Sequence, residues 1–221
     1  GDNYMHFQFL IEDYSGAVLI NKVMEKVKSS HCFTYDCKAF KGIGGFRNGH
    51  NGKEVKTNKL LCDLPIYLKG FDNSLKGIEA CIFIVLDNDT RDTAEFIDEL
   101  LKLADESMIT IDKVFCIAVE EMEAWLLGDE KALFSAYPSA KEGKYKEYTQ
   151  DSICGTWEIL ADIVYEGGIK KFKKDCPTYR EVGKYKAEWA EKIGDFFDID
   201  NNKSPSFQHF IYEIQHRLET A

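Results

Sequence analysis

Residues 80–90 read ACIFIVLDNDT, and this stretch is the strongest indication of the fold class. Its first seven residues are all apolar, and the run stops at Asp87. A short continuous apolar run that ends at turn-forming residues is typical of a strand buried on both faces of a parallel sheet. The stretch therefore predicts a central strand followed by a polar loop at its carboxyl end.

The sequence on either side of this strand alternates between strand and helix patterns. Strands are predicted at 6–11 (HFQFLI), 32–40 (CFTYDCKAF) and 114–119 (VFCIAV). Apolar residues at helical spacing predict the helices between them, with Ser15 and Asp92 as two of the N-caps. Strands separated by helices of this length form right-handed βαβ units. Residues 1–130 are therefore predicted to form a parallel α/β sheet flanked by helices.

Beyond residue 130 the pattern becomes helical. Apolar residues recur at helical spacing within 157–164 and 182–193. Ser204 followed by Pro205 is a typical helix start, whereas the polar segment 137–150 is predicted to be a loop. We therefore expect residues 131–221 to form a helical C-terminal extension packed on the α/β domain.

The composition indicates a globular protein and predicts its cellular compartment. Of the 221 residues, 44% are hydrophobic and 30% are charged, which is typical of a globular chain. No apolar run approaches the ~20 residues of a membrane span, and the net charge of −10 opposes non-specific adsorption to nucleic acid or anionic lipid. Seven cysteines without a C-x-x-C pair, and no secretory leader pattern, predict a cytoplasmic protein without a disulfide framework or zinc ribbon.

Acidic residues follow three of the predicted strands. Glu12 ends the first, Asp87 and Asp89 end the third, and Glu120 ends the fourth, with Glu123 three residues later. Parallel sheets bind ligands outside the carboxyl ends of their strands. Carboxylates that converge there repel one another, and a hard cation such as Mg²⁺ or Mn²⁺ offsets that repulsion. The alternative is that these acids serve turns and, for Glu120 and Glu123 on one predicted helical face, a helix N-terminus.

A glycine-rich basic segment follows the second predicted strand. Between residues 38 and 59 there are six basic residues, one acidic residue and five glycines. Glycine lets backbone amides approach a phosphate, and Lys and Arg neutralise its charge. The segment predicts contacts with phosphate or nucleic acid, and the alternative is a solvated loop. The predicted contact residues are Lys41, Arg47, Lys53, Lys56 and Lys59.

Four short motifs resemble those of TOPRIM-fold proteins. FLIED (9–13) and IVLDND (84–89) resemble the acidic strand ends of the TOPRIM fold. AVEEMEAWLLGD (118–129) and KSPSFQHF (203–210) resemble, more specifically, a bacterial TOPRIM-like family of unknown function that is linked to phage defence or DNA processing. The resemblance implies a TOPRIM/Rossmann-like sheet in residues 1–130.

The resemblance also implies metal-dependent phosphodiester hydrolysis. Glu12 would be a general acid/base, and Asp87 and Asp89 would hold Mg²⁺ or Mn²⁺ next to it. The expected catalytic residues are thus Glu12, Asp87 and Asp89, and the expected metal ligands are these three together with Glu120 and Glu123. The chain would be a nuclease, or the nuclease-like subunit of a defence or DNA-processing system with nucleic acid and an ATPase as partners.

Other functions fit the same sequence. One alternative is a non-catalytic interaction subunit, in which the acidic residues at the strand ends form a degenerate site without hydrolytic activity. An aspartate-nucleophile phosphatase also uses D-x-D, but on its first strand, whereas here the motif follows the third. A phospho-accepting receiver domain needs a hydroxyl residue after the fourth strand, where this chain has Glu120.

Overall fold

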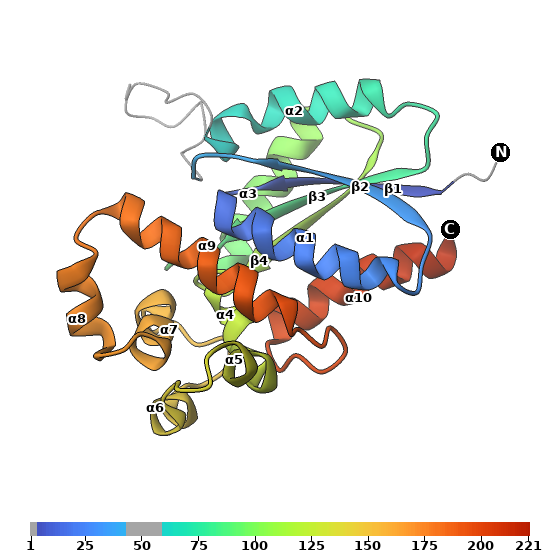
Figure 1. The fold of residues 1–221 in the computed structure, drawn as a ribbon. Helices are drawn as coiled ribbons and strands as arrows, with labels where there is room; N and C mark the ends of the chain where they lie inside the picture. Colours follow the sequence, from blue (N-terminus) through green and yellow to red (C-terminus); the bar gives the residue numbers. More distant parts are fainter. Residues whose placement is uncertain (1–3, 43–58) are drawn as a thin grey trace, which may run out of the picture.

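The centre of the fold is a four-stranded sheet in which all strands run parallel (Figure 1). The computed structural model, which describes residues 4–42 and 59–221, gives the strand order β2-β1-β3-β4. The strands are β1 (Met5–Ile11), β2 (Phe33–Ala39), β3 (Ala80–Asp87) and β4 (Asp112–Ala118). This parallel sheet, flanked by helices and followed by further helices, confirms the predicted α/β fold class.

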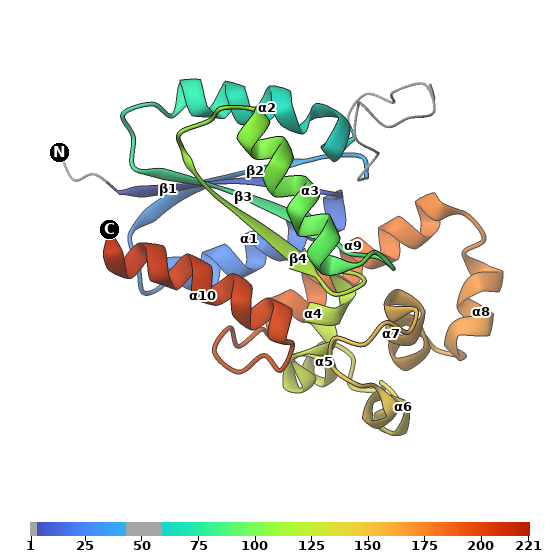
Figure 2. The same cartoon turned by 180° about the vertical axis from the view of Figure 1, so that it is seen from behind.

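Helices cover both faces of the sheet. The helices of the described residues are α1 (Tyr14–Lys28), α2 (Leu60–Ser74), α3 (Thr93–Glu106), α4 (Glu123–Leu127), α5 (Glu130–Ala136), α6 (Glu142–Glu147), α7 (Thr156–Val164), α8 (Gly168–Asp175), α9 (Tyr179–Asp195) and α10 (Pro205–Thr220). Helices α2 and α3 pack on one face, and α1 and α10 pack on the other, with α9 alongside α1 (Figure 2). Successive residues of β3 point alternately into these two cores, which explains its continuous apolar sequence.

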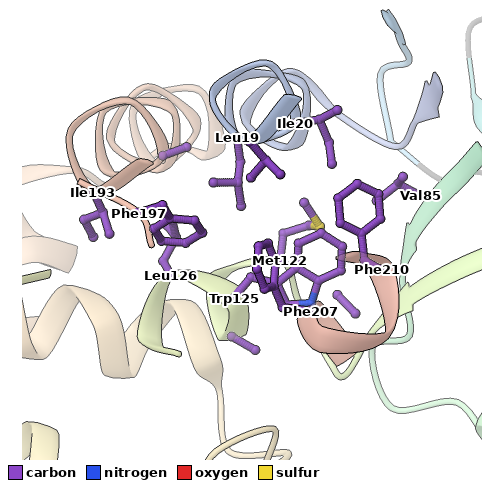
Figure 3. Packing of buried hydrophobic residues seen from close by; sticks show 14 of the residues in the cluster. Leu19, Ile20, Val85, Met122, Trp125, Leu126, Ile193, Phe197, Phe207 and Phe210 are labelled. Atoms are coloured by element: carbon purple, nitrogen blue, oxygen red, sulfur yellow. The ribbon is translucent and has the colours of Figure 1, made fainter. Parts of the chain in front are cut away.

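The C-terminal helix joins the sheet to the helical part of the molecule. The Ser204 hydroxyl caps α10, and the helix then directs Phe207 and Phe210 towards Trp125 (Figure 3). The Trp125 and Phe210 rings stack with centroids 5.2 Å apart, and Phe210 also meets Phe83 of β3 at 6.0 Å. These large apolar surfaces leave water together, which is the main stabilising contribution of the contact.

Hydrogen bonds also join residues 125–128 to residues 202–206 next to this core. Asn202 Nδ2 donates to the Trp125 carbonyl at 2.9 Å, and the backbone N–H of Lys203 donates to the Gly128 carbonyl at 2.8 Å. The Trp125 indole N–H donates to Ser206 Oγ at 2.9 Å. The motifs at 118–129 and 203–210 therefore form one structural unit, in which most of their residues support the fold.

Gly128 lies where this unit is tightest, and replacing it should destabilise the protein. An alanine Cβ at Gly128 would lie 1.9 Å from Asn202 Oδ1 and 3.0 Å from the Ser204 backbone nitrogen. Asn202 is held by its own hydrogen bonds, so we expect Gly128→Ala to lower the free energy of unfolding by about 2–3 kcal/mol in urea denaturation. Gly143→Ala in α6 is the control, because nothing lies within 4 Å of its added Cβ. Equal stability of the two variants would contradict this assignment.

Some predictions of local structure are wrong. The N-cap of α1 is Asp13, not Ser15, because the Asp13 carboxylate accepts the Gly16 N–H at 2.8 Å. The segment 137–150 is not a continuous loop but contains α6, which tertiary contact stabilises: Tyr145 is buried and its hydroxyl donates to the Leu127 carbonyl at 2.7 Å. Asp92 does cap α3, as predicted.

No disulfide forms among the seven cysteines, all of which lie in the described residues. None of the helices in 4–42 and 59–221 has both the length and the apolar character that crossing a lipid bilayer requires.

Candidate functional site

The order of the strands places the candidate site at the junction of β1 and β3. From β1 the chain passes through α1 to β2 on one side, and it then returns across β1 through α2 to β3 on the other side. Parallel α/β proteins bind ligands at the carboxyl ends of the two strands that flank such a reversal. Glu12 follows β1 and Asp87 ends β3, so the two acids lie on either side of this junction.

Hydrogen bonds hold these two side chains in place. The backbone N–H of Asp87 donates to Glu12 Oε2 at 2.7 Å, and the backbone N–H of Met122 donates to Asp87 Oδ1 at 2.9 Å. Within the described residues, neither Glu12 Oε1 nor Asp87 Oδ2 accepts a hydrogen bond. We call Glu12 and Asp87 the acid pair, and in each of them one carboxylate oxygen accepts no hydrogen bond from the described residues.

Charge is disfavoured on both members of the acid pair. Burial is the largest cause that raises the pKa of Glu12 to about 8, with contributions from the charges of Asp13 and Asp89. The pKa of Asp87 lies well above its usual value because the side chain is buried and because Glu12 and Glu123 are near. A site of this kind is stabilised by a cation that lets both carboxyls ionise.

Asp89 lies beyond the acid pair, at the rim of the site. Its backbone adopts a φ of 53°, which is rare for a residue other than glycine. Its carboxylate pairs with the Arg91 guanidinium at 3.1 Å, and that guanidinium lies 4.8 Å from the centre of the Phe96 ring. Asn88 holds the loop in this shape because its Nδ2 donates to the Arg91 carbonyl and to Thr93 Oγ1, both at 2.9 Å.

Glu120 has a structural role in the fold. Its Oε1 accepts hydrogen bonds from the backbone N–H and the hydroxyl of Thr156 at 2.5 and 2.7 Å, which fixes the start of α7. The prediction that Glu120 and Glu123 share a helical face is wrong, because Glu120 has a φ of 60° and precedes α4, which starts at Glu123. We therefore leave Glu120 out of the proposed metal site.

Lys186 of α9 is a functional candidate that the sequence reasoning missed. Its Nζ lies 3.8 Å from Glu123 and 4.0 Å from Glu121, and both acids are largely buried. Burial lowers the pKa of the Lys186 ammonium, but the charges of these two acids and of Asp87 outweigh that effect and raise the pKa above its usual value. Lys186 is thus a permanent cation beside the acid pair. Lys186 is also the ion-pair partner of Glu123, so the charge of Glu123 is balanced without a metal ion.

Only part of the predicted basic segment lies in the described residues. The Gly42 N–H donates to the Glu12 carbonyl at 2.8 Å, and the Leu60 N–H donates to the Gly42 carbonyl at 3.0 Å, so both ends of the segment meet beside Glu12. Lys59 Nζ donates to the carbonyl of Lys41. The other predicted contact residues, Arg47, Lys53 and Lys56, lie outside the described residues.

The site has a limited set of metal ligands. In the part of the chain that the structure describes, no group of three or more His, Cys, Asp or Glu side chains is arranged to hold a metal ion.

Comparisons of the chain with protein-family models, with curated proteins and with solved structures found no match.

Proposed function

We propose that the chain is a Mg²⁺- or Mn²⁺-dependent phosphodiester hydrolase whose site is the acid pair. The observation that carries the proposal is the 2.7 Å contact that joins Glu12 to the backbone of Asp87 at the reversal of the strand order. Buried carboxyls with strongly raised pKa values at such a reversal are more typical of functional sites than of structural ones. The TOPRIM resemblance of the same residues supports this reading, and it suggests a nuclease or a nuclease-like subunit.

The donor set of the acid pair suits Mg²⁺ better than a transition metal. Mg²⁺ prefers oxygen ligands and is commonly held by one or two carboxylates, with waters and substrate phosphate oxygens completing its coordination. Glu12 Oε1 and Asp87 Oδ2 supply two such oxygens, and Asp89 would need to leave Arg91 to supply a third. A bound ion would activate a water and stabilise charge on the leaving oxygen.

The residues around a bound ion would supply the other functions of the site. Glu12, whose pKa of about 8 keeps it largely protonated near neutral pH, would lose its proton when the ion binds, and its carboxylate would then help to hold the ion. Arg91 lies close enough to Glu12 to lower its pKa, so its guanidinium is placed to bind a phosphate oxygen. Lys41 and Lys59, at the two ends of the basic segment, would add to the attraction for an anionic substrate.

Hydrolysis of labelled single-stranded and duplex oligonucleotides with Mn²⁺ tests this proposal. We expect the wild type to cleave one of these substrates, and the Asp87→Ala, Asp89→Ala double variant to cleave none. Asp92→Ala is the matched control: this residue caps α3, so its loss should cost about 1 kcal/mol of stability while cleavage persists. No cleavage by the wild type, or undiminished cleavage by the double variant, would contradict the proposal and favour the non-catalytic interaction subunit.

A further inference from the structure

Helix α8 carries a cationic surface that the proposed site does not use. Its sequence, GIKKFKKD, contains four lysines and one aspartate in a chain whose net charge is −10. Phe172 is buried against the neighbouring helices, whereas the four lysine side chains are exposed. The apolar side of this amphipathic helix packs in the fold, and of the four lysines on its other side only Lys171 forms an ion pair with a described residue.

Three of these lysines form no ion pair with the described residues. Lys171 pairs with Asp175 at 2.6 Å and lies 5.6 Å from the centre of the Tyr165 ring. Lys170, Lys173 and Lys174 have no salt-bridge partner within the described residues, and we call them the α8 lysine surface. Lys170 and Lys174 are one helical turn apart, so the cations follow one another along the exposed side of the helix. Unpaired lysines in a row repel each other until an anion lies across them.

The α8 lysine surface belongs to a helix at the same end of the molecule as the acid pair. Helix α8 and the first turns of α9 lie at the end towards which the strands of the sheet point (Figure 1). A single side chain connects the two places: Lys173 Nζ is 6.0 Å and Lys186 Nζ is 5.5 Å from the centre of the Trp157 ring. The backbone N–H of Trp157 donates to Glu121, which lies beside Lys186. An extended anion on α8 would therefore reach towards the carboxyl ends of β1 and β3.

An exposed aromatic residue follows these lysines closely in the sequence. Tyr179, the first residue of α9, is 97% exposed, and Arg180 follows it on the surface. Lysines that track a phosphate backbone, together with an aromatic ring on which a base can stack, are the combination that single-stranded nucleic-acid sites use. A lipid headgroup layer could also pair with the lysine charges, but it contains no base that could stack on Tyr179.

We propose that the α8 lysine surface binds the phosphate backbone of a nucleic-acid strand and guides that strand to the acid pair. This inference rests on the proposed function for its choice of partner, and it makes the substrate a polynucleotide rather than a small phosphodiester. The basic segment at 38–59 is a separate feature on another part of the chain.

Binding of a labelled single-stranded DNA oligonucleotide, measured by fluorescence anisotropy over a range of salt concentrations in EDTA, tests this inference without any cleavage. The test variant is Lys170→Gln, Lys173→Gln, Lys174→Gln. The control variant, Lys69→Gln, Lys102→Gln, Lys131→Gln, removes the same charge from exposed lysines elsewhere. We expect the test variant to bind about tenfold more weakly and to lower the slope of log K against log salt by about 2, because three phosphate contacts are lost. The control variant should retain the wild-type slope.

Three results would overturn the inference. The first is no binding by the wild type, and the second is equal weakening in the test and control variants. The third is that anionic phosphatidylserine vesicles, but not the oligonucleotide, bind through these lysines, which would assign the surface to a membrane.

The cleavage assay distinguishes failure of this inference from failure of the proposed function. Lysine-dependent binding without Mn²⁺-dependent cleavage would uphold this inference and contradict the proposed function, and cleavage with lysine-independent binding would do the reverse.

Discussion

Asp87→Asn should abolish Mn²⁺-dependent cleavage and at the same time stabilise the metal-free protein. Asparagine keeps an oxygen that accepts the Met122 N–H, so the local hydrogen bond survives while the negative charge is lost. Loss of a group that acts on transition-state charge should lower kcat by about 10³-fold. Removal of a buried charge beside Glu12 should raise the free energy of unfolding in EDTA at pH 8 by roughly 1–3 kcal/mol, since each unit of pKa shift corresponds to about 1.4 kcal/mol.

The pH dependence of stability follows from the raised pKa values. The pKa of Glu12 is about 8 in the folded chain, against an ordinary value of 4.5, so the folded state binds its proton more tightly than the unfolded state. The resulting stabilisation is fully present below about pH 4.5 and is lost as the pH rises through about 8. The metal-free wild type should therefore become less stable from pH 5 to pH 8, and Asp87→Asn should reduce that slope.

Urea denaturation in EDTA at several pH values, with and without Mn²⁺, measures these effects. We expect Mn²⁺ to restore stability to the wild type at pH 8 but not to Asp87→Asn. A loss of stability in Asp87→Asn at pH 8, or an unchanged pH slope, would show that Asp87 is a structural acid whose charge the fold requires.

Lys186→Met should have the largest effect on stability of any single change near the site. Methionine fills a similar volume but leaves Glu121, Glu123 and Asp87 without their shared cation. Breaking a largely buried ion pair from one side costs about 3–5 kcal/mol. Because burial and Glu123 raise the pKa of Glu121 to about 8, Glu121 is largely protonated at pH 5. The loss of stability should therefore be large at pH 8 and much smaller at pH 5.

Lys192→Met on the same helix is the matched control. Lys192 is half-exposed and pairs with Glu188 on the surface, so its loss should change the free energy of unfolding by about 0–1 kcal/mol. Thermal or urea unfolding of both variants at pH 5 and pH 8 separates the two cases. Similar effects of the two substitutions, or no pH dependence for Lys186→Met, would mean that Lys186 does not neutralise the acids beside Asp87.

The strand pattern made much of the fold predictable, but not the order of the strands. The apolar run that ends at Asp87 and the helical spacings around it are local features, and they identify the elements correctly. The contact between Glu12 and Asp87 depends on β1 lying next to β3, which is a property of the whole sheet. The sequence therefore predicted which acids end strands but could not establish that these two lie together.

The roles of the remaining acids depended on contacts between distant segments. Glu120 was assigned to a helix face because the local sequence EEMEAWLL looks helical, but its partner is Thr156, thirty-six residues away. Lys186 had a detectable signal: it occupies the i+4 position after Val182 and lies three residues before Trp189, on the apolar side of α9. A lysine on an apolar helix face indicates a buried charge, which needs acidic partners.

Binding of Mn²⁺ to the intact chain, measured by titration calorimetry at pH 8, tests whether the acid pair holds a metal ion. We expect one bound ion per chain, with proton release as Glu12 ionises, and no binding to Glu12→Gln or Asp87→Asn. Glu120→Gln should bind as the wild type does, because Glu120 serves Thr156 instead. Absence of binding to the wild type, or binding that survives both substitutions in the acid pair, would contradict a metal site at Glu12 and Asp87.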